Sequence, residues 1–185
     1  MKRLAKKMVF AAGLISAMCL AGATTTEASL VTSAPSGSTV IDFSQFSGGW
    51  LWGAGPTQVG SLVGDDVVFT STTTSSVIGD GGYGFAGNGS WNGKSGAGLN
   101  ANLATMTFTF NSGLVSSVGG FMNYAAPGYA DVILSVYDGL NTLLESYNIS
   151  ALAPISTPSG FNAGAFRGIV RSTADISYFT LSNGF

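Results

Sequence analysis

Acidic residues that could bind a cation are concentrated at two points of the chain. Asp65 and Asp66 are adjacent and follow Gly64, and Asp80 begins a glycine-rich stretch. Neighbouring side chains on a strand point to opposite faces, so the pair could share an ion only in a turn, which Gly64 favours. Calcium binds about 6–8 oxygen ligands, which carboxylates and asparagine carbonyls can supply. Asp65, Asp66 and Asp80 are therefore the candidate calcium ligands, and a solvated turn is the alternative.

Aromatic and amide side chains are interleaved in the glycine-rich stretch, residues 79–102. Aromatic rings stack on sugars, and amides form hydrogen bonds with sugar hydroxyls. The candidate carbohydrate-binding residues are Tyr83, Asn88, Trp91 and Asn92. In the alternative interpretation, asparagine and glycine supply left-handed turn conformations and the rings only anchor the loop. Trp50 and Trp52 would share one strand face, as a second platform or as part of the core.

The chain lacks the residues that most catalytic mechanisms require. It contains no histidine, and its one cysteine, Cys19, lies in an N-terminal segment that we expect to be removed. Ser-His and Cys-His catalysis, imidazole metal sites and disulfides are therefore excluded in the mature chain. A glycosidase needs two carboxylates across a cleft, and nothing in the sequence pairs the acids. We predict a protein that is not an enzyme and has no cofactor other than the calcium considered above.

The N-terminus has the pattern of a secretory signal. Four basic residues precede an apolar run over residues 8–20, and Ala21-Gly22-Ala23 follows. The run is shorter than the ~20 residues that span a bilayer. Residues 1–28 are predicted to be a signal peptide and short linker, cleaved after Ala23 or Ala28. A core helix and a lipoprotein signal acylated at Cys19 are the alternatives. We expect recognition by the export machinery and a secreted or cell-surface location.

Few cations remain after such a cleavage, namely Lys94, Arg167 and Arg171. The net charge is then about −5. Nucleic acids and anionic membrane surfaces are bound by clustered lysine and arginine, so neither is an expected partner. Arg167 and Arg171 are four residues apart on one strand face, where ion pairs with Asp175 or Glu145 are expected.

Strand patterns recur along the rest of the chain. Apolar and polar residues alternate, or β-branched and aromatic residues cluster, over residues 39–43, 67–70, 105–110, 117–124, 131–137, 142–149, 166–171 and 176–182. Asp138-Gly139 predicts a hairpin turn, and residues 172–175 are short enough for a second hairpin. Gly119-Gly120 indicates a bulge or a close approach. Residues 79–102 are predicted to be a long surface loop, and residues 151–164, with two prolines, a crossover.

The composition supports the same fold class. Charged residues make up 9% of the chain and hydrophobic residues 45%, which favours strands with hydroxyl-bearing outer faces over long helices. We predict an all-β fold, an antiparallel two-sheet β-sandwich of jelly-roll-like type, following an N-terminal signal peptide helix. Residues 29–185 form its single domain.

Several short motifs together resemble a known group of proteins. They are Gly79-Asp80-Gly81-Gly82-Tyr83-Gly84, Gly87-Asn88-Gly89-Ser90-Trp91, Val118-Gly119-Gly120-Phe121-Met122-Asn123-Tyr124, Val136-Tyr137-Asp138, Leu143-Leu144-Glu145, Pro154-Ile155-Ser156-Thr157-Pro158 and Asn162-Ala163-Gly164-Ala165-Phe166-Arg167-Gly168-Ile169. The set is similar to exported bacterial proteins of the PEP-CTERM type, which are exosortase substrates. The resemblance covers most of the chain from about residue 41 to residue 185.

The resemblance implies placement at the cell surface or in the extracellular matrix, without established catalysis and without catalytic residues. Such proteins usually continue into a Pro-Glu-Pro motif, an apolar helix and a basic tail, which are not found before Phe185. Either the last strand and the anchor are missing, the interpretation we favour, or the protein is freely secreted. Membrane association is expected only through that anchor. The expected function is a non-catalytic structural surface protein; the alternative is a lectin-like module that binds extracellular polysaccharide or calcium.

Overall fold

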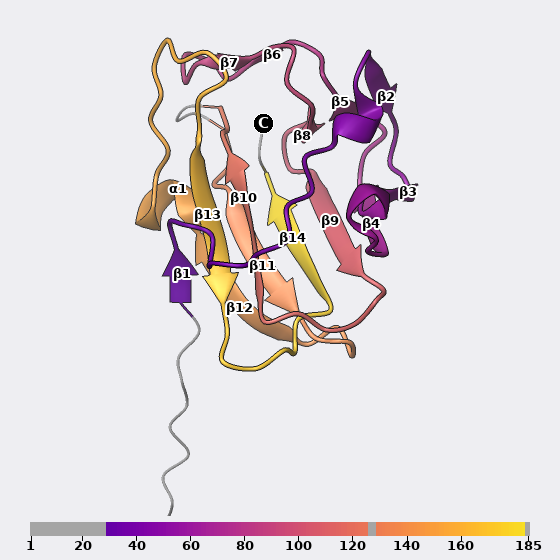
Figure 1. Cartoon of the computed structure of the whole chain (residues 1–185). Coiled ribbons are helices and arrows are strands. Elements are labelled where there is room, and N and C mark those ends of the chain that lie inside the picture. The colour runs from indigo at the N-terminus through magenta and orange to yellow at the C-terminus, as the bar shows by residue number, and fades with distance from the viewer. Residues whose placement is uncertain (1–28, 126–128, 184–185) are drawn as a thin grey trace, which may run out of the picture.

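The computed structural model describes residues 29–125 and 129–183, and the predicted signal segment with Cys19 lies outside them (Figure 1). The described chain is an all-β sandwich, as the composition and the strand patterns predict. All pairs of its named strands are antiparallel. No helix in residues 29–125 and 129–183 is long and apolar enough to cross a membrane.

One layer of the sandwich is a six-stranded sheet. In spatial order its strands are β12 (Leu143–Asn148), β11 (Ile133–Tyr137), β14 (Tyr178–Ser182), β9 (Thr105–Phe110), β4 (Val67–Ser71) and β3 (Thr57–Gln58). The predicted hairpin at Asp138-Gly139 is confirmed, since it joins β11 to β12. β14 lies between β11 and β9 and is paired on both sides. The outer edges of this sheet are therefore β12 and β3.

The other layer is divided into two small sheets and a short hairpin. One sheet has the order β1 (Ser29–Val31), β13 (Ala165–Val170), β10 (Ser117–Met122), and the other has β2 (Trp50–Trp52), β5 (Ser76–Gly79), β8 (Gly96–Leu99). The hairpin of β6 (Tyr83–Gly84) and β7 (Ser90–Trp91) lies at the top of Figure 1. The remaining elements are the helix α1 (Ile149–Leu152) and two 3₁₀ turns, Ser44–Phe46 and Ser61–Val63.

Strand alternation sorts the side chains of the six-stranded sheet into an inner and an outer face. Val136, Phe179, Phe108 and Phe69 occupy paired positions across β11, β14, β9 and β4, and they face the core. The next row carries hydroxyls on the opposite face, because successive strand residues alternate in direction. That row is Ser146, Ser135, Thr180, Thr107 and Thr70, of which Ser135 and Thr180 are buried. The sequence pattern of residues 105–110 predicted this division.

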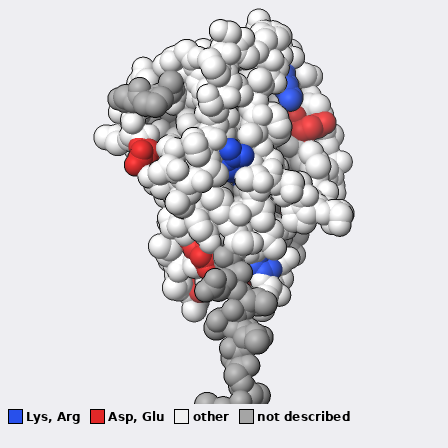
Figure 2. Space-filling model, turned by 90° about the vertical axis from the view of Figure 1, so that its left-hand side faces the viewer, with Lys and Arg blue, Asp and Glu red and all other residues white. Residues whose placement is uncertain are grey.

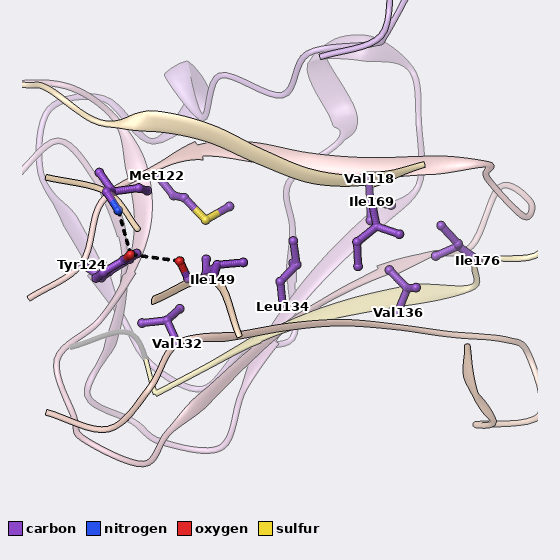
Figure 3. Close-up of a cluster of buried hydrophobic side chains, with 10 residues drawn as sticks. Val118, Met122, Tyr124, Val132, Leu134, Val136, Ile149, Ile169 and Ile176 are labelled. Atoms are coloured by element: carbon purple, nitrogen blue, oxygen red, sulfur yellow. Dashed lines mark hydrogen bonds between the residues drawn. The ribbon is translucent and has the colours of Figure 1, made fainter. Parts of the chain in front are cut away.

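The core consists of two adjoining clusters. In the first, Val118 of β10 and Ile169 of β13 pack against Leu134 and Val136 of β11 (Figure 3). In the second, Phe69, Met106 and Phe108 of the large sheet pack with Ile78 of β5 and Leu99 of β8. Phe110, Phe179 and Leu181 contact both clusters. The second layer is divided into separate small sheets. The inner face of the six-stranded sheet is therefore buried in two areas, one at each cluster.

The structure corrects three of the expected elements. Residues 39–43 are not a strand: the carboxylate of Asp42 accepts hydrogen bonds from the backbone N–H and the hydroxyl of Ser44, and Phe43 is left-handed with φ 58°. This local turn competes with strand pairing. Residues 172–175 do not close a hairpin, since β13 and β14 belong to different layers. The stretch 79–102 is not one long loop, because it contains β6, β7 and β8.

The glycine pair at 119–120 marks a close approach of two strands. Gly119 faces Gly168 in the register of β10 and β13. A Cβ on Gly119 would lie 2.6 Å from the ring of Phe166 and 2.7 Å from the carbonyl oxygen of Arg167. The register of the two strands is continuous through this point, so the alternative of a bulge does not apply.

Candidate functional site

A buried polar cluster, which we call the Asn88 hub, joins segments that are far apart in the sequence. Asn88 is only 6% exposed. Its Nδ2 donates toward Asn123 Oδ1 at 2.9 Å and toward the carbonyl oxygens of Tyr124 and Ile155, both at 3.0 Å. Its Oδ1 accepts the N–H of Thr157 at 2.7 Å. The amide is therefore engaged on both sides by groups of the protein itself.

The backbone of the same residue completes the hub. Asn123 Nδ2 lies 2.8 Å from the carbonyl oxygen of Asn88, and the hydroxyl of Thr157 donates to that oxygen at 2.9 Å. Gly89, the next residue, is left-handed with φ 86°, and a Cβ there would lie 2.6 Å from the carbonyl oxygen of Gly160. Asn88 thus ties the loop between β6 and β7 to the crossover that follows α1. Asn88 therefore has a structural role, but through its side-chain hydrogen bonds and not through a left-handed backbone, which Gly87 and Gly89 adopt on either side of it.

The crossover is held from its other side by a buried arginine. Arg167, in β13, is 8% exposed and donates to the carbonyl oxygens of Ala153, Pro154 and Phe166 at 2.6, 2.9 and 2.7 Å. The hydroxyl of Tyr124 accepts the N–H of Ile155 at 2.9 Å (Figure 3). The ion pair expected for Arg167 is therefore replaced by contacts with backbone carbonyls.

Arg171 makes both of the ion pairs that the sequence suggested. It binds Asp175 through two hydrogen bonds, of 2.7 and 2.8 Å, and Glu145 through one of 2.8 Å. The hydrogen bonds from Arg171 hold the pKa of Asp175 below its ordinary value, and the same contact raises the pKa of Arg171. This arrangement fixes the connection between β13 and β14, where the chain passes from one layer to the other.

A row of five aromatic side chains runs along β2, β6 and β7. We call Trp52, Trp50, Tyr83, Phe85 and Trp91 the aromatic row. The successive ring centroids are 5.1, 5.7, 6.0 and 6.0 Å apart. Tyr83 and Trp91 are also cross-strand partners in the β6–β7 hairpin. Beyond Trp91, the ammonium of Lys94 lies 5.8 Å from that ring and 5.4 Å from the ring of Phe121.

A small pocket of about 170 Å³ opens on the aromatic row. It is lined by Trp50, Gly82, Tyr83, Gly84 and Asn100. The hydroxyl of Tyr83 is buried and has no hydrogen-bond partner among the described residues. Burial raises the pKa of Tyr83 to about 12, so the hydroxyl keeps its proton at neutral pH. The side chain of Asn100 is exposed and forms no hydrogen bond within the described part of the chain.

The structure brings together part of the predicted carbohydrate-binding set. Tyr83 lines the pocket, Trp91 belongs to the same aromatic row, and Asn92 Oδ1 lies 3.6 Å from the point where a Cβ on Gly82 would stand. The indole N–H of Trp91 donates to the carbonyl oxygen of Ala163 at 3.0 Å, which fixes that ring. The sequence suggested Trp50 and Trp52 as a second platform, but that Trp50 lies beside Tyr83 could not be predicted, because its position depends on the pairing of β2 with β5.

The three candidate calcium ligands do not form one site. Asp80 accepts the backbone N–H groups of Gly48 and Gly49 at 2.9 and 2.7 Å, and the bond from Gly48 is the main reason that its pKa is lowered. Asp66 accepts a hydrogen bond from Gln58, while Asp65 has one buried oxygen without a partner. Across residues 29–125 and 129–183, no three acidic or other metal-binding side chains are grouped to hold an ion.

The pocket and the aromatic row present rings, amides and backbone groups. No carboxylate lines the pocket, so the paired acids of a glycosidase are not present there. The groups on this surface could stack on a ligand and exchange hydrogen bonds with it. No protein-family model, curated protein or solved structure matches the chain.

Proposed function

We propose that this protein is an exported, non-catalytic structural protein of the cell surface or extracellular matrix, of the PEP-CTERM type. One observation carries the proposal: three of the seven motifs on which the resemblance rests meet in the Asn88 hub. Asn88, Asn123 and Thr157 come from three of those motifs and bind one another. The polar side chains of these residues bind one another and so hold the loops against the sandwich.

The surface supports a structural role outside the cell. Figure 2 shows a face on which charged side chains are isolated among uncharged ones. Lys94 is the one lysine among the described residues, and the chain contains no histidine. A nucleic-acid or phosphate-rich partner would need clustered cations. An uncharged, hydroxyl-bearing exterior suits a protein embedded in a hydrated matrix.

Export can be tested directly by expressing the full chain with a C-terminal tag in a bacterial host. We expect the tag outside the inner membrane and a new N-terminus after Ala23 or Ala28, found by mass spectrometry of the purified product. Leu14→Arg places a charge in the apolar run and should keep the chain inside, whereas Leu14→Val should not. An intact N-terminus on a chain retained in the cytoplasm would contradict the proposal.

A second measurement separates matrix placement from free secretion. The tagged protein is assayed in the washed matrix and in the culture medium of the same cells. The proposal requires most of the exported protein in the surface or matrix fraction. The calcium-binding alternative is tested on the same material, because an ion bound by the folded state raises the melting temperature. Equal melting temperatures in calcium and in EDTA would exclude it.

A further inference from the structure

We propose that the pocket between Trp50 and Tyr83 binds one sugar unit of a neutral polysaccharide and that the aromatic row extends this contact along the chain of the polymer. The proposal goes beyond the structural role above and is independent of it. It reassigns part of the predicted ligand set, since Asn88 is withdrawn into the hub and Trp50 and Asn100 take part instead.

The lining of the pocket selects for an uncharged ligand. Its five residues are aromatic, glycine or asparagine, and none carries a charge. The pKa of Tyr83 is raised to about 12, so its hydroxyl remains neutral as well. An anionic ligand would be desolvated there without a cation to compensate it, which is costly. The ammonium of Lys94 lies at the end of the row, between the rings of Trp91 and Phe121 and not in the lining of the pocket.

The chemistry of the lining matches that of a sugar. A sugar ring offers an apolar C–H face to the aromatic rings and hydroxyls at its edge to amides. The side-chain amide of Asn100 lines the pocket and forms no hydrogen bond with the described residues, and Asn92 places its Oδ1 beside Gly82. The hydroxyl of Tyr83 is buried and has no hydrogen-bond partner among the described residues, and its residue lines the pocket together with Asn100.

The dimensions of the pocket suit one sugar unit and not a whole drug-sized ligand. Pockets for whole drug-sized ligands enclose about 300–1,000 Å³, and this one encloses about 170 Å³. The row continues on both sides of it, to Trp52 in one direction and to the partly exposed Trp91 in the other, while Phe85 between Tyr83 and Trp91 is buried. Trp52 is 45% exposed. A chain of sugars could therefore contact the row beyond the unit held in the pocket.

Binding is measured on the purified exported protein by affinity electrophoresis. The probes are dextran, laminarin, galactomannan and hydroxyethyl cellulose as neutral polymers, with alginate and polygalacturonate as charged ones. We expect retardation by at least one neutral polymer and by neither charged polymer. All three tryptophans of the chain lie in the row, so the same polymer should also change the tryptophan fluorescence.

Matched variants locate the site. Asn100→Ala should weaken binding by about threefold to tenfold, the range for one hydrogen bond, while Asn111→Ala, at the far end of β9, should leave it unchanged. Gly84→Val should weaken it as well, because Gly84 lines the pocket and a Cβ there meets no atom within 4 Å, so the larger side chain changes the lining without a clash. Circular dichroism of each variant verifies that the fold is retained.

Three outcomes would overturn this inference: no retardation by any of the neutral polymers, retardation by the charged polymers alone, or equal affinity for the wild type, Asn100→Ala and Gly84→Val. Each of these leaves the proposed structural function standing, because export and matrix placement are measured separately. Conversely, a protein retained in the cytoplasm that still bound dextran through Asn100 would refute only the proposed function.

Discussion

Replacement of Asn88 by alanine should destabilise the protein more than any other single change in the loop between β6 and β7. Asn88 Nδ2 has two hydrogens and faces three oxygens, and Oδ1 accepts from Thr157. The variant therefore loses at least two donated bonds and one accepted bond, and their partners remain buried. At about 1–1.5 kcal/mol for each bond, the free energy of unfolding should fall by about 3–4 kcal/mol. That is a large share of the ~5–15 kcal/mol typical of a domain.

The assay is urea and thermal unfolding of the exported protein, followed by circular dichroism and tryptophan fluorescence. A loss of this size should lower the melting temperature by about 10 °C in a domain of this length. Asn92→Ala is the matched control, since its exposed side chain forms no hydrogen bond within the described residues, and it should change stability by less than about 0.5 kcal/mol.

Asn88→Asp sharpens the test. It keeps the shape of the side chain but turns a carboxylate toward the oxygens of Asn123, Tyr124 and Ile155, so it should destabilise at least as much as alanine. If Asn88→Ala stays within about 1 kcal/mol of the wild type, the hub does not stabilise the fold in the way argued here. The structural interpretation of the motifs would then lose its main support.

Three further predictions concern backbone, charge and pH. Gly89→Ala should destabilise the protein by more than about 1 kcal/mol, because the φ of Gly89 is positive and the added Cβ would meet the carbonyl oxygen of Gly160. Gly84→Ala is the control and should be nearly neutral in the same urea titration. Equal effects of the two substitutions would contradict this. Arg167→Lys should lower the free energy of unfolding by about 2 kcal/mol, because lysine cannot reproduce the guanidinium fork that binds three carbonyl oxygens. Arg171 is more exposed, so Arg171→Lys should lower it by less. The reverse order of the two effects would be a refutation. Stability should be level from about pH 5 to about pH 9, because the chain has no histidine, and a step near pH 6.5 would contradict this. It should fall below about pH 4, because four folded-state carboxyl pKa values lie below the ordinary 3.8 and their contribution is lost as pH falls through them; they belong to Asp42, Asp80, Asp138 and Asp175. Above about pH 10 it should fall again, as the raised pKa of Tyr83 leaves the folded state less able to ionise.

Local sequence patterns were sufficient to predict those strands that bury only one of their two faces. The alternation of residues 105–110 corresponds to β9 in full, and the pattern around Val132, Leu134 and Val136 identified the most buried face in the core. Period-two alternation is a property of the strand itself, so it can be read without knowing the partner strand. The turn at Asp138 was equally local, since its carboxylate accepts the N–H groups of Leu140 and Thr142.

Short strands rich in glycine escaped prediction. β8 contains Gly96 and Gly98, and β6 and β7 are two residues long, so none shows an alternating pattern. Their pairing depends on neighbours far away in the sequence, such as β5 for β8. The length of the connection at residues 172–175 fits a hairpin, but β13 and β14 pair with distant strands in different layers. The contact of Arg171 with Asp175 instead stabilises a connection between the two layers.

The sequence alone determined the all-β class, the hydroxyl-bearing outer face and the absence of histidine and cysteine chemistry in the described domain. These follow from composition and from period-two alternation, which are properties of the chain before it folds. Only the tertiary structure decided which asparagines face inward and which face solvent. Asn88 and Asn100 both belong to the stretch 79–102, but one meets carbonyl groups from two distant segments and the other stands beside an open pocket. Hydrogen-bond partners are a matter of position in space, and no spacing along the chain specifies them.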